Sequence, residues 1–233
     1  MSITLHNHPP RRSGRRPDRA RRREAAGPPA LYDNALKRLV DVVGASALLL
    51  LFGPLMILLW LLVRRDGGPG IYRQPRLGAE GVPFDCLKFR SMCVDSEAAL
   101  QRQLARDPAA AEEWRRTHKL RNDPRVTRIG RFLRRSSLDE LPQILNVLRG
   151  DMSLVGPRPI VAAEVARYGR YFASYRSCRP GITGLWQVSG RSDTRYRRRV
   201  ALDHAYRRKW RLLLDARIIL ATPMVMIRGS GAY

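Results

Sequence analysis

The chain has 233 residues and a formal net charge of +24, so it is long enough for one sizeable domain with appendages. This charge predicts anionic partners, either nucleic acid, acidic lipid headgroups or phosphorylated substrates, and does not choose among them. Cys86, Cys93 and Cys178 form no CxxC pair and no even set, and the four histidines show no metal-ligand spacing, which argues against a zinc site and a disulfide framework.

Residues 1–30 are polar, basic and interrupted by proline and glycine. The run "RRSGRRPDRARRR" contains almost nothing that a core could bury, so we predict a disordered basic tail. No apolar region with a small-residue cleavage site follows at the distance typical of a signal peptide.

An apolar run from Leu36 to Val63 is long enough to cross a bilayer. Basic residues flank it on both sides, and this bias places both of its ends on the cytoplasmic face. Gly53-Pro54 lies midway, where proline removes a backbone donor and bends or breaks a helix. We therefore predict a re-entrant helix-break-helix over residues 31–65. The alternative is a straight single-pass helix with a tolerated kink.

The remainder, residues 66–233, is expected to form one cytoplasmic domain. Turn signals around "IYRQPRL" and "PFDCLKF" predict a small β-hairpin, whose period-two alternation directs Lys88 and Arg90 to one face. We predict surface helices over residues 95–120, interrupted at Pro108. The segment "WRLLLDARIILATPMVMIRG" carries Asp215 among apolar residues, which favours an amphipathic helix that packs on the fold or lies at the lipid interface.

Two adjacent acids, Asp139 and Glu140, stand in "RRSSLDELPQILNVLRGDMSLVGPRP". An apolar pattern at i, i+3, i+4 and i+7 from Leu141 predicts a helix that Gly150 ends. Because proline is comfortable only in a first helical turn, Pro142 puts the two acids at or just before the helix N-terminus. The alternative is structural: Ser137-Leu-Asp-Glu140 has the form of a capping box.

Several arginines surround this acid pair in the sequence. Arg134 precedes it, Arg158 follows between two prolines, and Arg191 ends the loop "RPGITGLWQVSGR". Cations that neutralise phosphates and a carboxylate pair able to hold Mg²⁺ are the components that phosphoryl transfer needs. Neither a Walker-type loop nor a GxGxxG motif is present, which removes the usual support for kinase, P-loop and Rossmann interpretations.

At these residues the chain resembles the bacterial sugar transferase family of monotopic polyprenyl-phosphate phosphoglycosyl transferases. The resemblance covers about Lys37 to Tyr233 and rests on "KRLVDVV", "KFRSM", "LDELPQILNVLRGDMSLVGPRP", "RPGITGLWQVSGR" and "WRLLLDARIIL" in order. It implies an α+β, mostly helical monotopic membrane protein, with a re-entrant helix, a hairpin and interfacial helices around a compact catalytic domain. The variant "GLWQVSGR" is most similar to exopolysaccharide-initiating galactose-1-phosphate or glucose-1-phosphate transferases. Gly53 stands where many members have serine, so this chain lacks a hydroxyl that could satisfy freed backbone groups at the break.

The resemblance also implies the chemistry. Asp139 matches the nucleophile that attacks the β-phosphorus of a UDP-sugar and expels UMP, and Glu140 matches the acid that holds Mg²⁺. Undecaprenyl phosphate would then accept the phosphosugar. The family positions associated with the substrate are matched by Lys88, Arg90, Arg134, Arg158, Arg191 and Asp215, the role of the last being open.

The implied location is the bacterial inner membrane, with the catalytic domain facing the cytoplasm. The implied partners are the UDP-sugar, undecaprenyl phosphate, inner-membrane lipid and downstream glycosyltransferases, without nucleic acid. The competing interpretation from the residues alone is a membrane-tethered basic protein that binds nucleic acid or acts as a scaffold. Against it, no helix-turn-helix, RNP or zinc-finger pattern is present.

Overall fold

The computed structural model describes residues 34–118, 120–190 and 195–227, so the predicted tail of residues 1–30 lies outside the described part of the chain. The main elements, in chain order, are α2 (Ala35–Arg64), β1 (Ile71–Leu77), β2 (Pro83–Phe89), α3 (Ser96–Arg106), α4 (Pro108–Thr117), α5 (Arg128–Ser136), α6 (Gln143–Arg149), β3 (Ser153–Val155), α7 (Val165–Tyr168), α8 (Phe172–Arg176), β4 (Gly181–Thr183), α9 (Leu185–Val188), α10 (Tyr196–Lys209) and α11 (Leu212–Ile227). The 3₁₀ turns are η2 (Ala79–Gly81), η3 (Leu138–Glu140), η4 (Ala162–Glu164) and η5 (Gly169–Tyr171).

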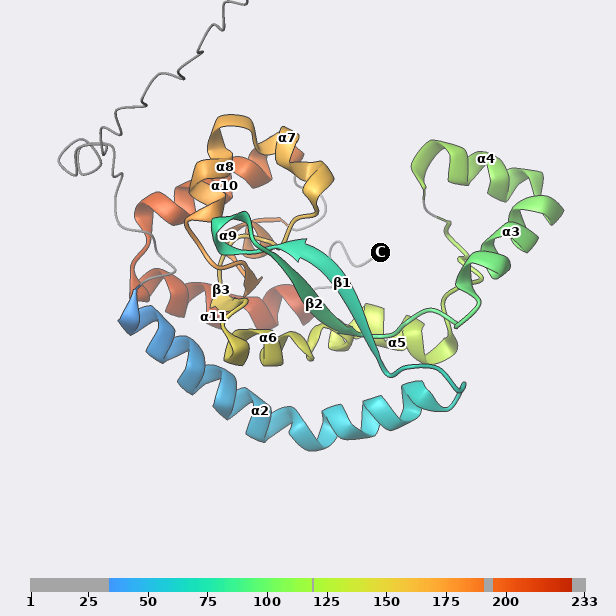
Figure 1. Ribbon diagram of the computed structural model, residues 1–233, viewed down its shortest axis with the longest axis horizontal. Coiled ribbons are helices and arrows are strands. Elements are labelled where there is room, and N and C mark those ends of the chain that lie inside the picture. Colours follow the sequence, from blue (N-terminus) through green and yellow to red (C-terminus); the bar gives the residue numbers. More distant parts are fainter. Residues whose placement is uncertain (1–33, 119, 191–194, 228–233) are drawn as a thin grey trace, which may run out of the picture.

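The apolar segment forms one helix, α2, of 30 residues. Asn34 caps it by accepting a hydrogen bond from the Lys37 backbone N–H at 2.9 Å. Pro54 lies inside the helix without ending it. Figure 1 shows α2 as a continuous curved helix along one side of the molecule, so the predicted break is a bend rather than an interruption.

The amino-terminal end of α2 is tied to the domain by buried polar contacts. Lys37 Nζ donates to Asp215 Oδ2 on α11 at 2.8 Å, and both side chains are buried. Four residues on, Asp41 Oδ1 accepts from Ser153 Oγ on β3 at 2.9 Å. Unpaired charges at these buried positions would be costly, and the pairing therefore fixes where α2 begins against the domain.

The carboxyl-terminal end of α2 is tied to the same domain by Arg90. Its Nη2 donates to the Val63 carbonyl at 3.0 Å, and its Nε donates to the Pro69 carbonyl at 2.6 Å. The guanidinium also pairs with Asp66. Both ends of α2 thus contact one folded body.

The side of α2 that faces away from the domain is apolar and exposed. Its exposed large hydrophobic residues are Leu36, Leu39, Val40, Val43, Leu50, Leu51, Ile57, Leu58 and Leu61. By length and composition α2 is able to cross a membrane. Exposed apolar surface on this scale is typical of a membrane or protein contact, which agrees with the predicted membrane association.

The predicted hairpin is confirmed, since β1 and β2 pair antiparallel in the register Ile71↔Phe89 to Leu77↔Pro83. The predicted surface helices are also present as α3 and α4, which Figure 1 shows far from α10 and α11. Pro108 is the first residue of α4 and therefore does not interrupt a helix. Asp107 caps α4 by accepting hydrogen bonds from two backbone N–H groups of the first turn.

A second, two-stranded sheet pairs β3 and β4 in parallel, and the sequence did not predict it. The backbones approach so closely that a Cβ added to Gly181 would lie 2.1 Å from the Gly156 nitrogen. Glycine is therefore required where the motifs "VGPRP" and "RPGITG" meet. The largest core cluster surrounds this sheet and includes Met152, Val155 and Ile218.

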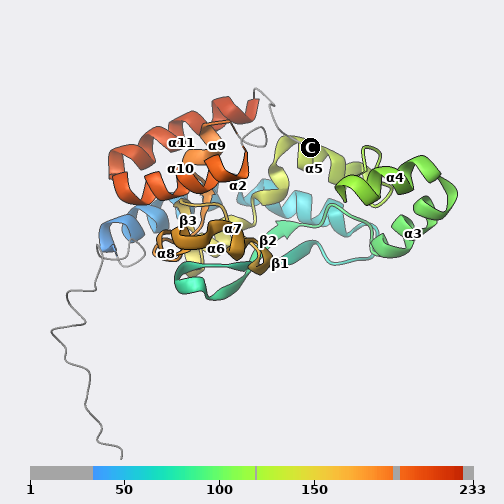
Figure 2. The same ribbon diagram turned by 90° about the horizontal axis from the view of Figure 1, so that it is seen from above.

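The helices α10 and α11 pack beside each other, as Figure 2 shows from above. Tyr206 of α10 donates its hydroxyl to Asp215 Oδ1 of α11 at 2.8 Å. Asp215 thus joins α2, α10 and α11. The predicted C-terminal helix is present as α11, whose exposed hydrophobic residues include Leu213, Leu220 and Met224.

Candidate active site

The acid pair lies in the turn η3, between α5 and α6. Pro142 occupies the N-cap position of α6, so Asp139 and Glu140 stand just before a helix N-terminus, as the sequence predicts. Ser137 has a φ of 57° and its side chain makes no capping hydrogen bond. The alternative interpretation as a capping box is therefore wrong, and the helix cap does not explain the two acids.

The helix α5 is seated directly on the segment that follows β2. A Cβ added to Gly130 would lie 2.0 Å from the Ser91 carbonyl oxygen, so only glycine fits there. One turn later, Arg134 Nε donates to Ser91 Oγ at 2.9 Å. Residues four apart share a helix face, and Gly130 therefore brings Arg134 close to the end of "KFRSM".

Asn146 fixes α6 against β2. Its side-chain amide donates to the Asp85 carbonyl at 2.8 Å and accepts from the Leu87 backbone N–H at 2.9 Å. Asn146 is fully buried, so loss of either bond would leave an unpaired polar group. This clamp holds Lys88 opposite the acids, and Lys88 Nζ donates to Glu140 Oε1 at 2.6 Å.

Burial raises the pKa of Asp139 to about 6, and the neighbouring charge of Glu140 adds to this increase. Lys88 and Arg134 act in the opposite direction and lower the same pKa. Asp139 is thus a partly buried carboxylate that is still mainly ionised at neutral pH. A partly desolvated carboxylate with nearby cations is well suited to act as a nucleophile toward phosphorus.

Two further arginines, Arg76 and Arg158, act on Cys86 of β2, two residues before Lys88. Burial raises the pKa of the Cys86 thiol to about 11, and the charges that act on it are those of Lys88, Glu140, Arg76 and Arg158. Burial and the charge of Arg158 together lower the pKa of Arg76. Glu164 Oε2 lies 3.9 Å from Arg76 Nη1 and offsets part of the repulsion between the two arginines.

Two guanidinium groups lie over the ring of Trp186. The Cζ atom of Arg158 lies 5.5 Å from the ring centroid and that of Arg199 lies 4.7 Å from it. Among the described residues, the buried Trp186 Nε1 and Arg199 Nε have no hydrogen-bond partner, and neither has Gln187 Oε1. Buried groups left unpaired in this way are expected to gain partners from a ligand or water.

The structure brings together four of the predicted site residues, namely Asp139, Glu140, Lys88 and Arg134. Arg158 lies over the Trp186 ring, and its charge acts on Arg76 and Cys86. Arg191 lies outside the described residues.

Arg90 and Asp215 have other surroundings. Arg90 follows the end of β2, so the alternation of the strand does not continue to it, and its guanidinium faces the end of α2 instead of the acid pair. Asp215 is 3% exposed and accepts hydrogen bonds from Lys37, Tyr206 and Trp210. Both side chains hold helices in place.

Sequence reasoning did not single out Arg76 or Arg199. Arg76 lies opposite Phe84 in the hairpin register, and Phe84 is on the same face of β2 as Lys88. Extending the period-two alternation from β2 to β1 would therefore have predicted Arg76 on that face. Arg199 belongs to α10, whose strongly basic sequence does not distinguish the arginine that lies over Trp186 from its neighbours.

The donor set fits a magnesium ion held together with a substrate. No cluster of three metal-ligating side chains occurs in the described residues. Mg²⁺, however, commonly takes one or two carboxylates and completes its shell with water and substrate phosphates. The Glu140 side chain is 40% exposed, and its second oxygen forms no hydrogen bond or ion pair within the described part of the chain, so it is accessible to such an ion.

Comparison with known proteins gives the family. The sequence profile described as "Bacterial sugar transferase" matches residues 32–229, which is most of the chain. The chain belongs to the bacterial sugar transferase family. The match includes every residue of the acid pair, the hairpin and α9 to α11 described above.

Three curated relatives illustrate the similarity. The chain is 52% identical over 198 residues to the undecaprenyl-phosphate galactose phosphotransferase of Salmonella typhimurium, a match that covers 85% of this chain and 42% of that protein. It is 48% identical to the exopolysaccharide production protein ExoY of Rhizobium meliloti, covering 84% of this chain and 88% of the relative. It is 44% identical to a UDP-glucose:undecaprenyl-phosphate glucose-1-phosphate transferase of Caulobacter vibrioides, a match that covers 84% of this chain and 72% of that protein. The chain therefore spans less than half the length of the Salmonella relative and most of the Rhizobium one.

Proposed function

We propose that this sugar transferase moves a sugar-1-phosphate, galactose or glucose, from a UDP-sugar to undecaprenyl phosphate and releases UMP. This is the first membrane step of exopolysaccharide or other surface-glycan synthesis. The observation that carries the proposal is the acid pair of Asp139 and Glu140, desolvated at a helix N-terminus and paired with Lys88. The names of the Salmonella and Caulobacter relatives describe the same class of reaction, and the name of the Rhizobium relative mentions exopolysaccharide production.

Asp139 is the proposed nucleophile. Its carboxylate oxygen attacks the β-phosphorus of the UDP-sugar, the bond from that phosphorus to the bridging oxygen breaks, and UMP leaves with the bond's electron pair. The phosphosugar remains on Asp139 as an acyl phosphate. The phosphate oxygen of undecaprenyl phosphate then attacks the same phosphorus, which releases Asp139 and yields undecaprenyl-diphospho-sugar.

Glu140 is the proposed ligand of Mg²⁺, which neutralises charge on the diphosphate when it is bound. Lys88 contacts Glu140 at 2.6 Å and so holds the carboxylate on the side of the hairpin. A cation on one oxygen leaves the other available, and Lys88 therefore orients Glu140 without blocking it.

Arg134, Arg158 and Lys88 are the proposed phosphate-binding cations. Lys88 and Arg134 act on Asp139 from β2 and α5, and the charge of Arg158 reaches Cys86 on β2, two residues before Lys88. The unpaired Nε1 of Trp186 and Nε of Arg199 support a place for the nucleotide beside Arg158. Two N–H donors and stacked guanidinium planes suit a ribose and a phosphate. Arg191 stays a predicted member of this group.

The membrane arrangement that we propose is re-entrant, with the catalytic domain facing the cytoplasm of the inner membrane. A straight helix of 30 residues is about 45 Å long, which would place its ends on opposite faces of a bilayer. In this chain, Lys37 and Arg90 tie the two ends of α2 to one folded body. The bend at Pro54 and the exposed apolar residues between the ends support entry into the bilayer from one side.

The test is nucleotide release by the full chain in detergent with UDP-galactose or UDP-glucose, undecaprenyl phosphate and Mg²⁺. We expect UMP, a faster rate with the natural donor, and a loss of at least about a thousandfold for Asp139→Asn. Asp85→Asn, which removes a half-exposed acid of the hairpin, is the matched control and should keep turnover. Release of UDP in place of UMP would refute phosphosugar transfer.

The geometry is tested separately by cysteine labelling in a Cys93→Ser background, because the other two cysteines are buried. Asn34→Cys and Arg65→Cys place thiols at the two ends of α2. We expect both to react with an impermeant maleimide only from the cytoplasmic side. Labelling from opposite sides would establish a single-pass helix.

A further inference from the structure

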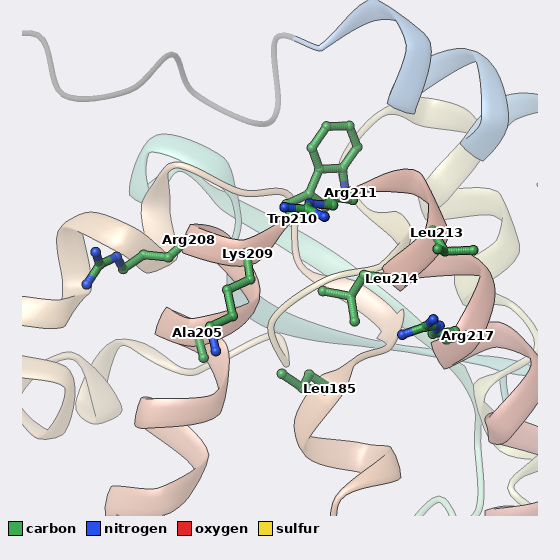
Figure 3. Close-up of a pocket in the computed structure, with 9 residues that line it drawn as sticks. All are labelled: Leu185, Ala205, Arg208, Lys209, Trp210, Arg211, Leu213, Leu214 and Arg217. Atoms are coloured by element: carbon green, nitrogen blue, oxygen red, sulfur yellow. The ribbon is translucent and has the colours of Figure 1, made fainter.

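A pocket of about 580 Å³ lies between the end of α10, the start of α11 and α9, apart from the acid pair (Figure 3). Its volume is within the range of small-molecule sites. Four of its lining residues are cations, namely Arg208, Lys209, Arg211 and Arg217. The reaction proposed above uses none of them.

The cations of this pocket are available to a ligand. In residues 34–118, 120–190 and 195–227, no carboxylate forms an ion pair with any of the four. Asp215 lies behind the pocket, but it already pairs with Lys37. Figure 3 shows Lys209 on α10 and Arg217 on α11 at two sides of Leu185 and Leu214, while Arg208 extends away from them. Such an arrangement attracts an anion.

The rest of the lining is apolar and includes Leu185, Leu213 and Leu214. Leu213 is also 62% exposed, and Leu220 and Met224 are exposed further along α11. These three residues recur at i, i+7 and i+11, which places them within about 20° of one line along the helix. The basic pocket thus opens onto an apolar stripe, and its ligand is expected to be both anionic and apolar.

The pocket is also joined to the membrane helix. Trp210, which lines it, donates Nε1–H to Asp215 Oδ2 at 3.1 Å. The same oxygen accepts from Lys37 Nζ near the start of α2 at 2.8 Å. The pocket therefore lies beside the start of α2. The ends of a membrane helix lie at the level of the lipid headgroups.

We propose that this pocket binds the phosphate headgroup of an anionic phospholipid of the surrounding bilayer. Lys209 and Arg217 bind the phosphate, and Leu213 with the stripe of α11 contacts the acyl chains. The bound lipid then fastens α11 to the membrane beside α2. This proposal does not depend on the identity of the transferred sugar.

The test is the thermal unfolding of the full chain in a neutral detergent with added phosphatidylglycerol. A ligand that binds only the folded state raises Tm, and at about a hundredfold its Kd we expect an increase of about 5 °C or more. Phosphatidylcholine should give no increase. Lys209→Gln with Arg217→Gln should lose the increase, and because both side chains are exposed, the variant should keep its Tm without lipid.

The matched control is Arg102→Gln with Arg106→Gln, which removes the same charge from exposed positions of α3, far from the pocket (Figure 1). It should keep the increase. An equal increase in the pocket variant would mean that bulk charge binds the lipid and would overturn the proposal. An equal effect of inorganic phosphate would assign a simple anion site instead. A response to undecaprenyl phosphate without one to phosphatidylglycerol would assign the pocket to the substrate lipid.

Discussion

Lys88 on β2 donates a hydrogen bond to Glu140 in η3 at 2.6 Å, across 52 residues of sequence. This contact joins the hairpin to the acid pair and places a positive charge beside two adjacent carboxylates. Lys88 also lowers the pKa of Asp139, which burial and Glu140 raise to about 6. The reactivity of Asp139 is therefore set by a balance of desolvation and charge that substitutions can change.

The rate of UMP release should depend on the ionisation of Asp139. Because its pKa is about 6, we expect the rate to fall about tenfold for each pH unit well below 6 and to be level from about pH 7 to 8. The measurement is kcat/KM for the UDP-sugar between pH 5 and 8, because this quantity reports the ionisation of the free enzyme. A level profile down to pH 5 would contradict the proposed state of this carboxylate.

Replacing Lys88 by Gln should move the midpoint of that profile upward. The substitution removes a cation that lowers the pKa of Asp139, so the acid form persists to higher pH. We expect an upward shift of the midpoint of about half a unit, which alone changes the ionised fraction at pH 7 only slightly. We also expect a loss of turnover of about tenfold at pH 7, mainly because a proposed phosphate-binding cation is removed. Lys88→Arg should restore most of both, and Arg106→Gln, an exposed charge on α3, should change neither.

Asp139→Asn should stabilise the fold at neutral pH while it abolishes turnover. The pKa of Asp139 is higher in the folded chain than the ordinary 3.8, so the folded state binds the extra proton between about pH 4 and 6. Stability attributable to this group therefore falls as pH rises through that window. We expect the variant to gain about 2 kcal/mol in free energy of unfolding at pH 7 and little at pH 4. Urea unfolding at both pH values measures this, and a destabilised variant at pH 7 would contradict it.

Much of the fold could be predicted from local patterns. The apolar run of α2, the alternation of β1 and β2, and Pro142 before α6 are each read from a few consecutive residues. The parallel pairing of β3 with β4 was missed, because each strand has three residues and the pairing depends on tertiary packing. The helix α10 was missed because it buries Val200, Asp203 and Tyr206, a face that includes an acid and so lacks an apolar pattern.

The acid pair was found in the sequence because Asp139, Glu140 and Pro142 are neighbours. The surroundings of single cations were not predictable in the same way. Lys88 and Arg90 are two residues apart and alternate like a strand pair, yet Lys88 meets Glu140 and Arg90 meets Asp66. The strand ends at Phe89, and this end decides which way Arg90 turns.

Asp215 should prove structural. Its carboxylate is buried and accepts from Lys37, Tyr206 and Trp210. Asp215→Ala therefore leaves the buried Lys37 ammonium with only the more distant carboxylate of Asp41, at 3.9 Å. We expect a loss of about 3–5 kcal/mol in free energy of unfolding, and a partial recovery when Lys37→Met is added. Chemical unfolding in detergent measures both. A variant with unchanged stability and a raised KM for the UDP-sugar would show instead that Asp215 contacts substrate.

Arg90 should likewise act through the fold. Arg90→Lys cannot reproduce the contacts to Asp66, Val63 and Pro69, because an ammonium lacks the planar array of donors. We expect a loss of about 2–4 kcal/mol and a Tm lower by about 5–15 °C, with KM for the UDP-sugar changed less than threefold at low temperature.

The pairing also has a pH signature, since the hydrogen bonds from Arg90 lower the pKa of Asp66. A lowered carboxyl pKa adds stability above the ordinary value of 3.8, and this stability is lost as pH falls through the folded-state pKa. The stability difference between the native chain and Arg90→Lys should therefore narrow below about pH 4. A raised KM for the UDP-sugar in an Arg90→Lys variant of unchanged stability would show instead that Arg90 contacts the substrate. Tm and KM should therefore be measured in the same preparation of each variant. Arg134→Lys is the contrasting variant: because Arg134 is exposed, this substitution should raise KM without lowering Tm.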